Sequence, residues 1–487
     1  MVEAKIKKNA IQKEVQSSDI EYLKETGLRV GDYIGAQISE AGYMKASHNY
    51  SFYIPMWFRD SCFTSMFLAD ASDFYQNDAF RHKSASLLNF MWKSSEKFLN
   101  NIKRGIEIPL EKPNFFDIIN HFPARIGEDG WYRGHRGMES DNPFLTSMEH
   151  SNWLRQYDSV PLLIGATAEY IKRFGVKDLD TSLQYIKDTL PGMIDYMIKV
   201  YKTPCSNLWE MDTDKIHSYD VAAIYYGMNS AMEIVKYIKG DLKNELIDDY
   251  DEIKKIKSKN YNALKSEDKE KIKIFSEKDA LCNDEAINSI DLQDMKKKLD
   301  EIDKFLKDYF IRDGIVYKSK NVFKPDKSGF ESEPIKEVDS GQILIFTRFK
   351  PPCATHEVQE NTMNKIEKDL FSGNVLPIRF KGDSYFLGGR WPLLGLEAAN
   401  WYLDNGKKEN AEKIIDYITD KYLGNSNAIP EQEIINPAST YDPADYLSKN
   451  NNRPISDLAW SESAYLGTVV KYLRIASDGI KKIKRKA

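Results

Sequence analysis

The chain has 487 residues, of which 41% are hydrophobic and 29% charged, and its formal net charge is −5 at pH 7. Because acids and bases nearly balance, the composition predicts neither nucleic acid nor an anionic membrane surface as a partner. No stretch approaches the ~18 consecutive apolar residues of a membrane-spanning helix, so we expect no membrane partner. The length allows either several domains or one large helical domain.

Apolar residues recur at helical spacing along most of the chain. A mostly apolar and aromatic stretch covers 52–74, and a long amphipathic helix is predicted over 79–104. Further helices are predicted at 20–39, 157–174, 183–201, 221–239, 292–310, 362–370, 392–405, 408–422 and 461–475. Short strands are predicted at 314–317 and 342–346. This pattern, which contains no short solenoid repeat, predicts an all-α toroid or bundle in a single domain, 1–487.

Two regions differ from this helical pattern. Residues 112–151 are rich in Pro, Gly, Asp and His without any period, which is typical of functional loops. Residues 241–285 are dense in Lys, Asp and Glu, which predicts a charged helical insertion at the surface.

The four cysteines are far apart and contain no CxxC pair, and the seven histidines never adopt HExxH-like spacing. Metal sites need closely spaced ligands, so we expect neither a metal nor another cofactor. Isolated cysteines favour a reducing compartment, and no apolar run follows Met1–Lys8. We therefore expect a cytoplasmic protein. No GxSxG turn is present, so acyl transfer is not expected.

Two glutamates have surroundings suited to acid–base chemistry. Glu210 follows Trp209 just beyond an amphipathic helix, and Glu431 lies in Ile429-Pro430-Glu431-Gln432. A carboxyl group against an apolar ring loses solvation, which raises its pKa and lets it act as a general acid near neutral pH. The structural alternative is an edge aromatic beside a solvated acid.

Polar and aromatic residues precede three of the apolar helices. Arg59 and Asp60 lie just before one helix, Trp153 and Arg155 before another, and Arg379 and Trp391 before a third. A guanidinium beside a carboxylate can bind vicinal hydroxyls, one donating and the other accepting. The alternative for Arg59 and Asp60 is a structural ion pair at a helix N-terminus, where Asp60 also suits the helix dipole. Helices entered through such loops indicate a barrel with a site at one rim.

Together these segments resemble the glucoamylase family, glycoside hydrolase family 15, which contains six-hairpin glycosidases. The segments follow the family's order from about residue 32 to residue 473. The matching pieces are Trp57-Phe58-Arg59-Asp60, Trp153-Leu154-Arg155, Leu208-Trp209-Glu210, Arg379 with Trp391, Ile429-Pro430-Glu431-Gln432 and Asp457-Leu458-Ala459-Trp460-Ser461.

The resemblance implies an (α/α)6 barrel and an inverting, exo-acting α-glucoside hydrolase. Such an enzyme releases β-D-glucose from the non-reducing ends of short α-linked glucose oligosaccharides. Glu210 matches the general acid, which protonates the glycosidic oxygen, and Glu431 matches the general base, which activates water. An inverting enzyme needs the two carboxyl groups roughly 6.5–9.5 Å apart. Glu433 stays open as an alternative base.

The resemblance also implies substrate-binding residues. Arg59 and Asp60 match the pair that binds the far hydroxyls of the terminal glucose, and Tyr53 matches an aromatic beneath that sugar. The remaining substrate-binding residues expected here are Trp57, Trp153, Trp209, Met211, Arg379 and Trp391.

Met211 departs from the family pattern, because fungal members have a second acid there that contacts the leaving-side sugar. The linkage is therefore open: a trehalase or an isomalto-oligosaccharide glucohydrolase are alternatives on the same fold. A non-catalytic sugar-binding barrel and a glycan phosphorylase are further alternatives. The phosphorylase would need a basic phosphate pocket near the base.

Overall fold

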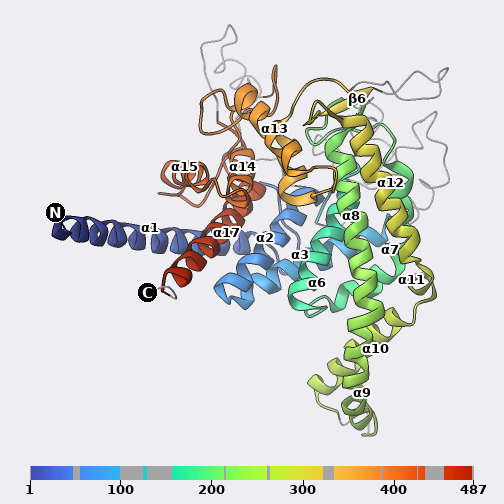
Figure 1. Cartoon of the computed structure of the whole chain (residues 1–487). Coiled ribbons are helices and arrows are strands. Elements are labelled where there is room, and N and C mark those ends of the chain that lie inside the picture. Colours follow the sequence, from blue (N-terminus) through green and yellow to red (C-terminus); the bar gives the residue numbers. More distant parts are fainter. Residues whose placement is uncertain are drawn as a thin grey trace, which may run out of the picture.

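The computed structural model describes residues 2–47, 55–98, 124–128, 156–212, 215–259, 264–321, 334–383, 385, 388–424, 426–433 and 455–484. Of the residues singled out above, Tyr53 and the segment Trp153-Leu154-Arg155 lie outside the described residues, as does most of the region 112–151. The described part is mostly helical, as predicted (Figure 1).

The helices occur at the predicted positions, although the first begins at Val2 rather than at the predicted residue 20 and others begin or end several residues away. They are α1 (Val2–Gln37), α2 (Phe58–Tyr75), α3 (Asp78–Glu96), α6 (Ser159–Phe174), α7 (Asp180–Val200), α8 (Ser218–Tyr237), α9 (Lys243–Lys257), α10 (Ser266–Cys282), α11 (Glu285–Ser289), α12 (Leu292–Phe310), α13 (His356–Ile366), α14 (Pro392–Asp404), α15 (Lys408–Ile418) and α17 (Ala459–Lys484). A π-helical turn follows α8, α13 and α15, at Ile238–Leu242, Glu367–Phe371 and Thr419–Leu423.

The strands are short and pair antiparallel, two to a sheet, within the described ranges. The pairs are β1 (Met56–Trp57) with β2 (Arg125–Ile126), β3 (Lys215–His217) with β6 (Ser319–Asn321), and β4 (Ile311–Arg312) with β5 (Ile315–Val316). The strand predicted at 314–317 is confirmed by β5.

The strand predicted at 342–346 is wrong. A 3-10 turn covers Ser340–Gln342, and the chain continues as helix through the π-helical turn Ile345–Phe349. Residues 343–346 are all buried, because this helix is enclosed on every side. A short apolar run fits a buried strand and a buried helix equally well, and tertiary packing selects the helix here.

Six helical segments form a closed inner ring within the described ranges. In order round the ring these are α2, α6, α8, the segment 340–349, α14 and α17, and α17 contacts α2 again. The outer helices α1, α3, α7, α12, α13 and α15 alternate with them along the chain (Figure 1). This is the predicted all-α (α/α)6 barrel.

Sequence patterns explain which helices are inner and which are outer. A helix that is apolar on all sides is buried, whereas an outer helix has one apolar stripe. The inner helix α14 is buried continuously from Pro392 to Leu403. Its outer neighbour α15 is amphipathic, and its buried residues are Ala411, Ile414, Ile415 and Ile418.

A glycine allows the first and last inner helices to close the ring. Gly467 of α17 faces Phe67 of α2, and a Cβ atom at this glycine would lie 2.0 Å from Phe67 Cδ1. Any side chain at this position would therefore push the two helices apart.

The charged region 241–285 contains α9, α10 and α11, and the α9–α10 pair projects from the barrel at the lower edge of Figure 1. The pair has a small apolar cluster of its own, formed by Ile253, Ile256 and Leu264. An ion pair between Lys278 and Glu245, with Nζ and Oε2 3.2 Å apart, joins the two ends of the hairpin. Its description as an insertion into a single domain stays a prediction.

Three properties of the described residues bear on the sequence expectations. No described helix is long and apolar enough to cross a membrane. The four cysteines are all buried, and none of them is joined to another by a disulfide bond. In the ranges given above, no three His, Cys, Asp or Glu side chains are grouped so that they could bind a metal ion.

Candidate active site

The N-terminal ends of the inner helices meet at one end of the barrel, which we call the site end. Arg59 at the start of α2 donates from Nη1 to Asp158 Oδ2 at 2.9 Å, just before α6. Tyr219 at the start of α8 also donates to Asp158 Oδ2, at 3.3 Å. The helix α17 is the other ring neighbour of α2, and the ring centroid of Trp460 at its start lies 5.5 Å from the Arg59 guanidinium carbon. Loops that are far apart in sequence therefore share one site.

The loop that carries Glu210 connects α7 to β3 and α8 at the site end. Asn207 Oδ1 accepts hydrogen bonds from the backbone N–H groups of Trp209 at 2.9 Å and Met211 at 3.0 Å. Glu210 itself has a left-handed backbone, with φ +62°, which is unfavourable for a residue other than glycine. The asparagine stabilises this turn by satisfying two backbone donors that the turn leaves without helical partners.

A buried histidine stabilises the same loop from behind. His217 Nε2 lies 3.2 Å from the carbonyl oxygen of Cys205 and 3.0 Å from that of Asp212. Burial lowers the pKa of His217 to about 4, so the ring is neutral at pH 7 and its Nε2–H donates to these carbonyls. His217 thereby joins the two ends of the loop, at Cys205 and Asp212.

The electrostatics of Glu210 agree with the expectation from sequence. The side chain is half-buried, and burial raises its pKa above the ordinary glutamate value. Three guanidinium groups oppose this shift, Arg125 most strongly and then Arg59 and Arg379, whereas Asp158 adds to it. The net upward shift favours the protonated form that a general acid needs.

Arg59 and Asp60 are both buried, with 7% and 5% of their surfaces exposed. Arg59 forms its short ion pair with Asp158 rather than Asp60, from which its Nε is 3.8 Å away. Burial raises the pKa of Asp60 to about 7, although the Arg59 cation opposes the shift. Thus Arg59 is fixed by a structural ion pair, and Asp60 is still free to donate or accept a hydrogen bond near neutral pH.

Arg379 is surrounded by aromatic rings and a carboxylate. Its Nε and Nη2 donate to the two oxygens of Asp383 at 2.7 and 2.6 Å, a bidentate pair. The guanidinium carbon lies 5.1 Å from the ring centroids of Trp209 and Trp391 and 4.7 Å from that of Tyr385. The two indoles are themselves 5.1 Å apart. This cluster joins the Glu210 loop to the start of α14.

Glu431 lies in the segment that leads to α17, and 5% of it is exposed. Tyr385 Oη donates to its Oε2 at 3.2 Å, and the Arg379 guanidinium interacts electrostatically with it. Since Arg379 also acts on Glu210, the same cation interacts electrostatically with both predicted acids.

Glu433 has different neighbours. Tyr417 Oη donates to both of its carboxylate oxygens at 3.1 Å, Tyr422 Oη contacts it closely, and Lys421 Nζ is 2.9 Å from it. These partners belong to the outer helix α15 and the turn that follows it. Glu433 is therefore saturated by structural contacts away from Arg379.

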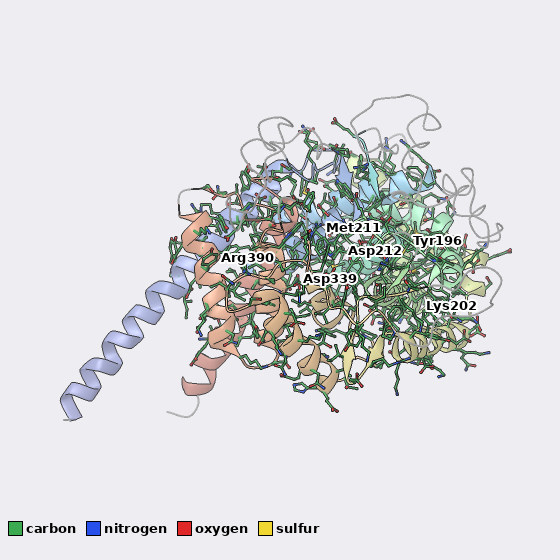
Figure 2. All side chains as sticks on the ribbon, turned by 90° about the horizontal axis from the view of Figure 1, so that it is seen from above. Tyr196, Lys202, Met211, Asp212, Asp339 and Arg390 are labelled. Carbon is green, nitrogen blue, oxygen red and sulfur yellow. The ribbon has the colours of Figure 1, made fainter. Side chains whose placement is uncertain are left out.

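Of the remaining predicted residues, Trp57 contacts two guanidiniums, Arg59 at 5.8 Å and Arg125 at 5.0 Å from its centroid. Met211 is 41% exposed on the Glu210 loop. Figure 2, seen from above, shows Met211, Asp212 and Asp339 over the middle of the barrel, whereas Tyr196 and Lys202 lie farther out.

Sequence reasoning missed several residues that surround the acids: Arg125, Asp158, Asp339, Asp383 and Tyr385. Three of them had a readable signal, since Asp158 lies in the same polar-aromatic segment as Trp153, and Asp383 and Tyr385 follow Arg379 in another such segment. Asp158 and Asp339 directly precede helical segments, where an acid is also an ordinary N-terminal residue.

No protein-family model and no curated protein sequence matches this chain. Solved structures do match it, and they support the fold. A solved glycosidase is similar in structure, with a TM-score of 0.63 and 18% identity over 94% of this chain and 98% of that one. A glycosidase variant in complex with glucose aligns over the same shares with a TM-score of 0.62 and 17% identity. A glucoamylase from Hormoconis resinae aligns at 15% identity with a TM-score of 0.49, over 93% of this chain and 73% of that one. The chain thus has the helical-barrel fold found in glycosidases.

Proposed function

We propose that this protein is an inverting, exo-acting α-glucoside hydrolase of the glucoamylase type, which releases β-D-glucose from short α-glucans. The observation that carries the proposal is that one cation at the site end, Arg379, interacts electrostatically with both Glu210 and Glu431. Fold similarity to glycosidases, one of them solved with glucose, supports a sugar substrate.

In the proposed reaction Glu210 is the general acid. Its raised pKa keeps a proton on the carboxyl near neutral pH, and the proton passes to the glycosidic oxygen as the bond from that oxygen to C1 breaks. A water molecule attacks C1 from the opposite face, and Glu431 accepts the proton that this water loses. The product is β-glucose, and the two carboxyl groups end with their protonation states exchanged.

Tyr385 and Arg379 support the proposed base. The Tyr385 hydroxyl donates to Glu431 Oε2 at 3.2 Å, which fixes the orientation of the carboxylate. Arg379 favours the ionised form of a nearby carboxyl group, as a base requires. Glu433 is the less suitable base, because its oxygens are engaged by tyrosines and a lysine.

Binding of the terminal sugar is assigned to the start of α2. Asp60, with a pKa of about 7, can exchange hydrogen bonds with sugar hydroxyls, and the ion pair between Arg59 and Asp158 fixes the neighbouring cation. The rings of Trp209 and Trp391 offer apolar surface, and aromatic faces suit the C–H surface of a sugar.

Contacts with the leaving-side sugar determine which glycosidic linkage the proposed enzyme cleaves. Met211 is exposed where a second acid would be, and Asp212 does not replace that acid, because its carboxylate forms a 2.8 Å ion pair with Lys215. Trehalose and isomalto-oligosaccharides therefore stay as alternatives to maltose-type substrates. A phosphorylase is less well supported, since Arg379, a cation that interacts electrostatically with Glu431, is already paired bidentately with Asp383.

Proton NMR of the purified protein with maltose, isomaltose or trehalose, in phosphate-free buffer, tests the proposal. β-Glucose should appear first from the maltose-type or isomaltose substrate that is cut. α-Glucose appearing first would contradict inversion, and turnover that requires added phosphate would favour the phosphorylase. No cleavage of any of these sugars would favour a binding role.

Matched variants identify the base in the same assay. Glu210→Gln and Glu431→Gln should each lower kcat by about 10²–10⁴. Glu433→Gln is the control, and we expect it to change kcat by less than about threefold. The opposite ranking of Glu431 and Glu433 would reassign the base.

A further inference from the structure

A buried aspartate from a distant segment contacts the residue next to the proposed acid. Trp209 Nε1 donates to Asp339 Oδ2 at 2.7 Å, and the two residues are 130 positions apart. Asp339 Oδ1 accepts from the Gly341 backbone N–H at 2.7 Å. Asp339 and Gln342 also form a capping box at the start of the inner segment 340–349. Asp339 therefore connects the Glu210 loop to the inner ring.

The indole packs closely against the start of the inner segment 340–349. A Cβ atom at Gly341 would lie 3.3 Å from Trp209 Cζ2 and 2.6 Å from Leu208 Cδ2, so the loop packs directly on the Gly341 backbone. The cavity beside this contact, lined among others by Trp209, Asp339 and His217, has a volume of about 20 Å³. That is room for about one water molecule and not for a rotated indole.

The hydrogen bond also determines which part of Trp209 can meet a ligand. An indole has a single donor, and Asp339 accepts it. The ring faces are left for contacts, and Arg379 and Trp391 already pack against the indole at 5.1 Å. Trp209 can therefore offer a ligand apolar ring surface and no hydrogen bond.

We propose that Asp339 is a positioning residue: it orients the Trp209 indole as a stacking surface for the substrate and thereby fixes the adjacent Glu210 peptide. The proposal rests on the proposed function for its catalytic part. It adds a residue that does not touch substrate and acts through Trp209. Asp339 is buried, with 7% of its surface exposed, so little solvent competes with these donors for its carboxylate.

Asparagine is the informative substitution at this position. Besides its part in the capping box, the Asp339 side chain accepts from the Trp209 indole through one oxygen and from the Gly341 backbone through the other. An asparagine side chain has one acceptor oxygen and presents an NH2 group to the other donor. Asp339→Asn therefore keeps the volume and can satisfy either Gly341 or Trp209, but not both.

The first test observes the indole directly and does not depend on activity. With ¹⁵N-labelled tryptophan, the eight indole N–H resonances are recorded, and Trp209→Phe assigns the Trp209 signal by its loss. Asp339→Asn should shift that signal and leave the others in place. An unchanged Trp209 signal would overturn the contact, and a shift of all signals would show a general structural change and overturn the specific role.

The second test is a double-mutant cycle on kcat/KM. Asp339→Asn should lower kcat/KM at least about tenfold, since small misplacements at an active site are costly. In the Trp209→Phe background the same change should cost less than about threefold, because the residues act as a unit. Equal losses in both backgrounds would overturn positioning through Trp209.

Asp303→Asn is the matched control. Asp303 of α12 likewise accepts a backbone N–H bond, from Cys353 at 2.8 Å, but lies on an outer helix. We expect this variant to keep kcat/KM within about twofold, and an equal loss would indicate a general stability effect instead. A wild-type protein inactive on every glucan would overturn the proposed function and the catalytic half of this inference, while the indole signal still decides the contact.

Discussion

Glu431 and Glu433 are two residues apart, yet their surroundings suit them to different roles. Glu431 faces Tyr385 and Arg379, and Glu433 faces Tyr417 and Lys421. The segment is irregular, and Glu433 pairs through its backbone with Arg390 on the chain that leads to α14. Because that pairing comes from tertiary contacts, the local sequence could not show which acid faces the site.

Arg125 is the strongest electrostatic partner of Glu210 and was not identified from sequence. It lies on β2, which pairs with β1 so that Arg125 is opposite Trp57. Its position falls inside the irregular region 112–151, which sequence analysis identified as a functional loop without selecting a residue. An irregular region has no hydrophobic periodicity that could show which of its side chains face the site. The position of Arg125 follows instead from the pairing of β2 with β1.

Replacement of Arg125 should change the pH dependence of the proposed enzyme. Its cation favours the ionised form of Glu210, so Arg125→Met should raise the pKa of this acid further. The alkaline limb of kcat/KM reports loss of the acid's proton and should therefore move to higher pH. Arg173→Met, which removes a cation paired with Asp70 and Glu169 instead, is the control and should leave the limb unchanged. A limb that moves to lower pH would contradict the assignment of Glu210.

At the scale of elements, each inner helix begins at the site end, and the loop before it supplies functional side chains. Asp60 comes with α2, Asp158 precedes α6, and Glu431 precedes α17. The acids near helix N-termini are favoured there by the helix dipole as well. Because the chain enters each inner helix from the same end of the barrel, the loops before these helices lie together and form the candidate site.

The α9–α10 hairpin lies outside this arrangement and tests the predicted insertion. Glu245 and Lys278 are joined by an ion pair, so a short Gly-Ser linker can replace residues 247–277 between them. We expect the shortened protein to keep kcat within about threefold, because the site loops are unchanged, and to lose some thermal stability. Removal of the small cluster of Ile253, Ile256 and Leu264 explains the stability loss. Loss of activity with the fold retained, checked by circular dichroism, would contradict a peripheral insertion.

At the scale of the whole molecule, the barrel closes where α17 packs between α1 and α2. A fully buried acid lies at this closure: Glu462 of α17 accepts from Gln37 Nε2 of α1 at 3.3 Å. Burial, together with the nearby acid Asp457, raises the pKa of Glu462 from 4.5 to about 8. The folded protein therefore holds a proton here that an unfolded chain releases.

Stability should consequently fall as the pH rises through this window. Between pH 4.5 and about 8 the unfolded state has lost the Glu462 proton and the folded state keeps it, so the free energy of unfolding decreases by up to about 1.4 kcal/mol per pH unit from this group. Glu462→Gln removes the titration. Urea unfolding should show the variant gaining stability relative to wild type from pH 5 to pH 8. An equal difference at both pH values would contradict the raised pKa.

The sequence by itself determined the class of fold and most of the helices. Helix periodicity, apolar inner helices and amphipathic outer helices are local patterns, and they depend on which residues must leave water. The order of polar-aromatic segments also indicated the rim of a barrel and selected Glu210, Arg59, Asp60 and Arg379. Tertiary structure decided those features for which the local sequence pattern fits more than one structure. It made the apolar run 342–346 helical, because enclosure in the inner ring satisfies a buried helix there. It also brought Asp158, Arg125 and Asp339 to the site, because contacts between loops that are ~100 residues apart depend on closure of the ring, which no local spacing encodes.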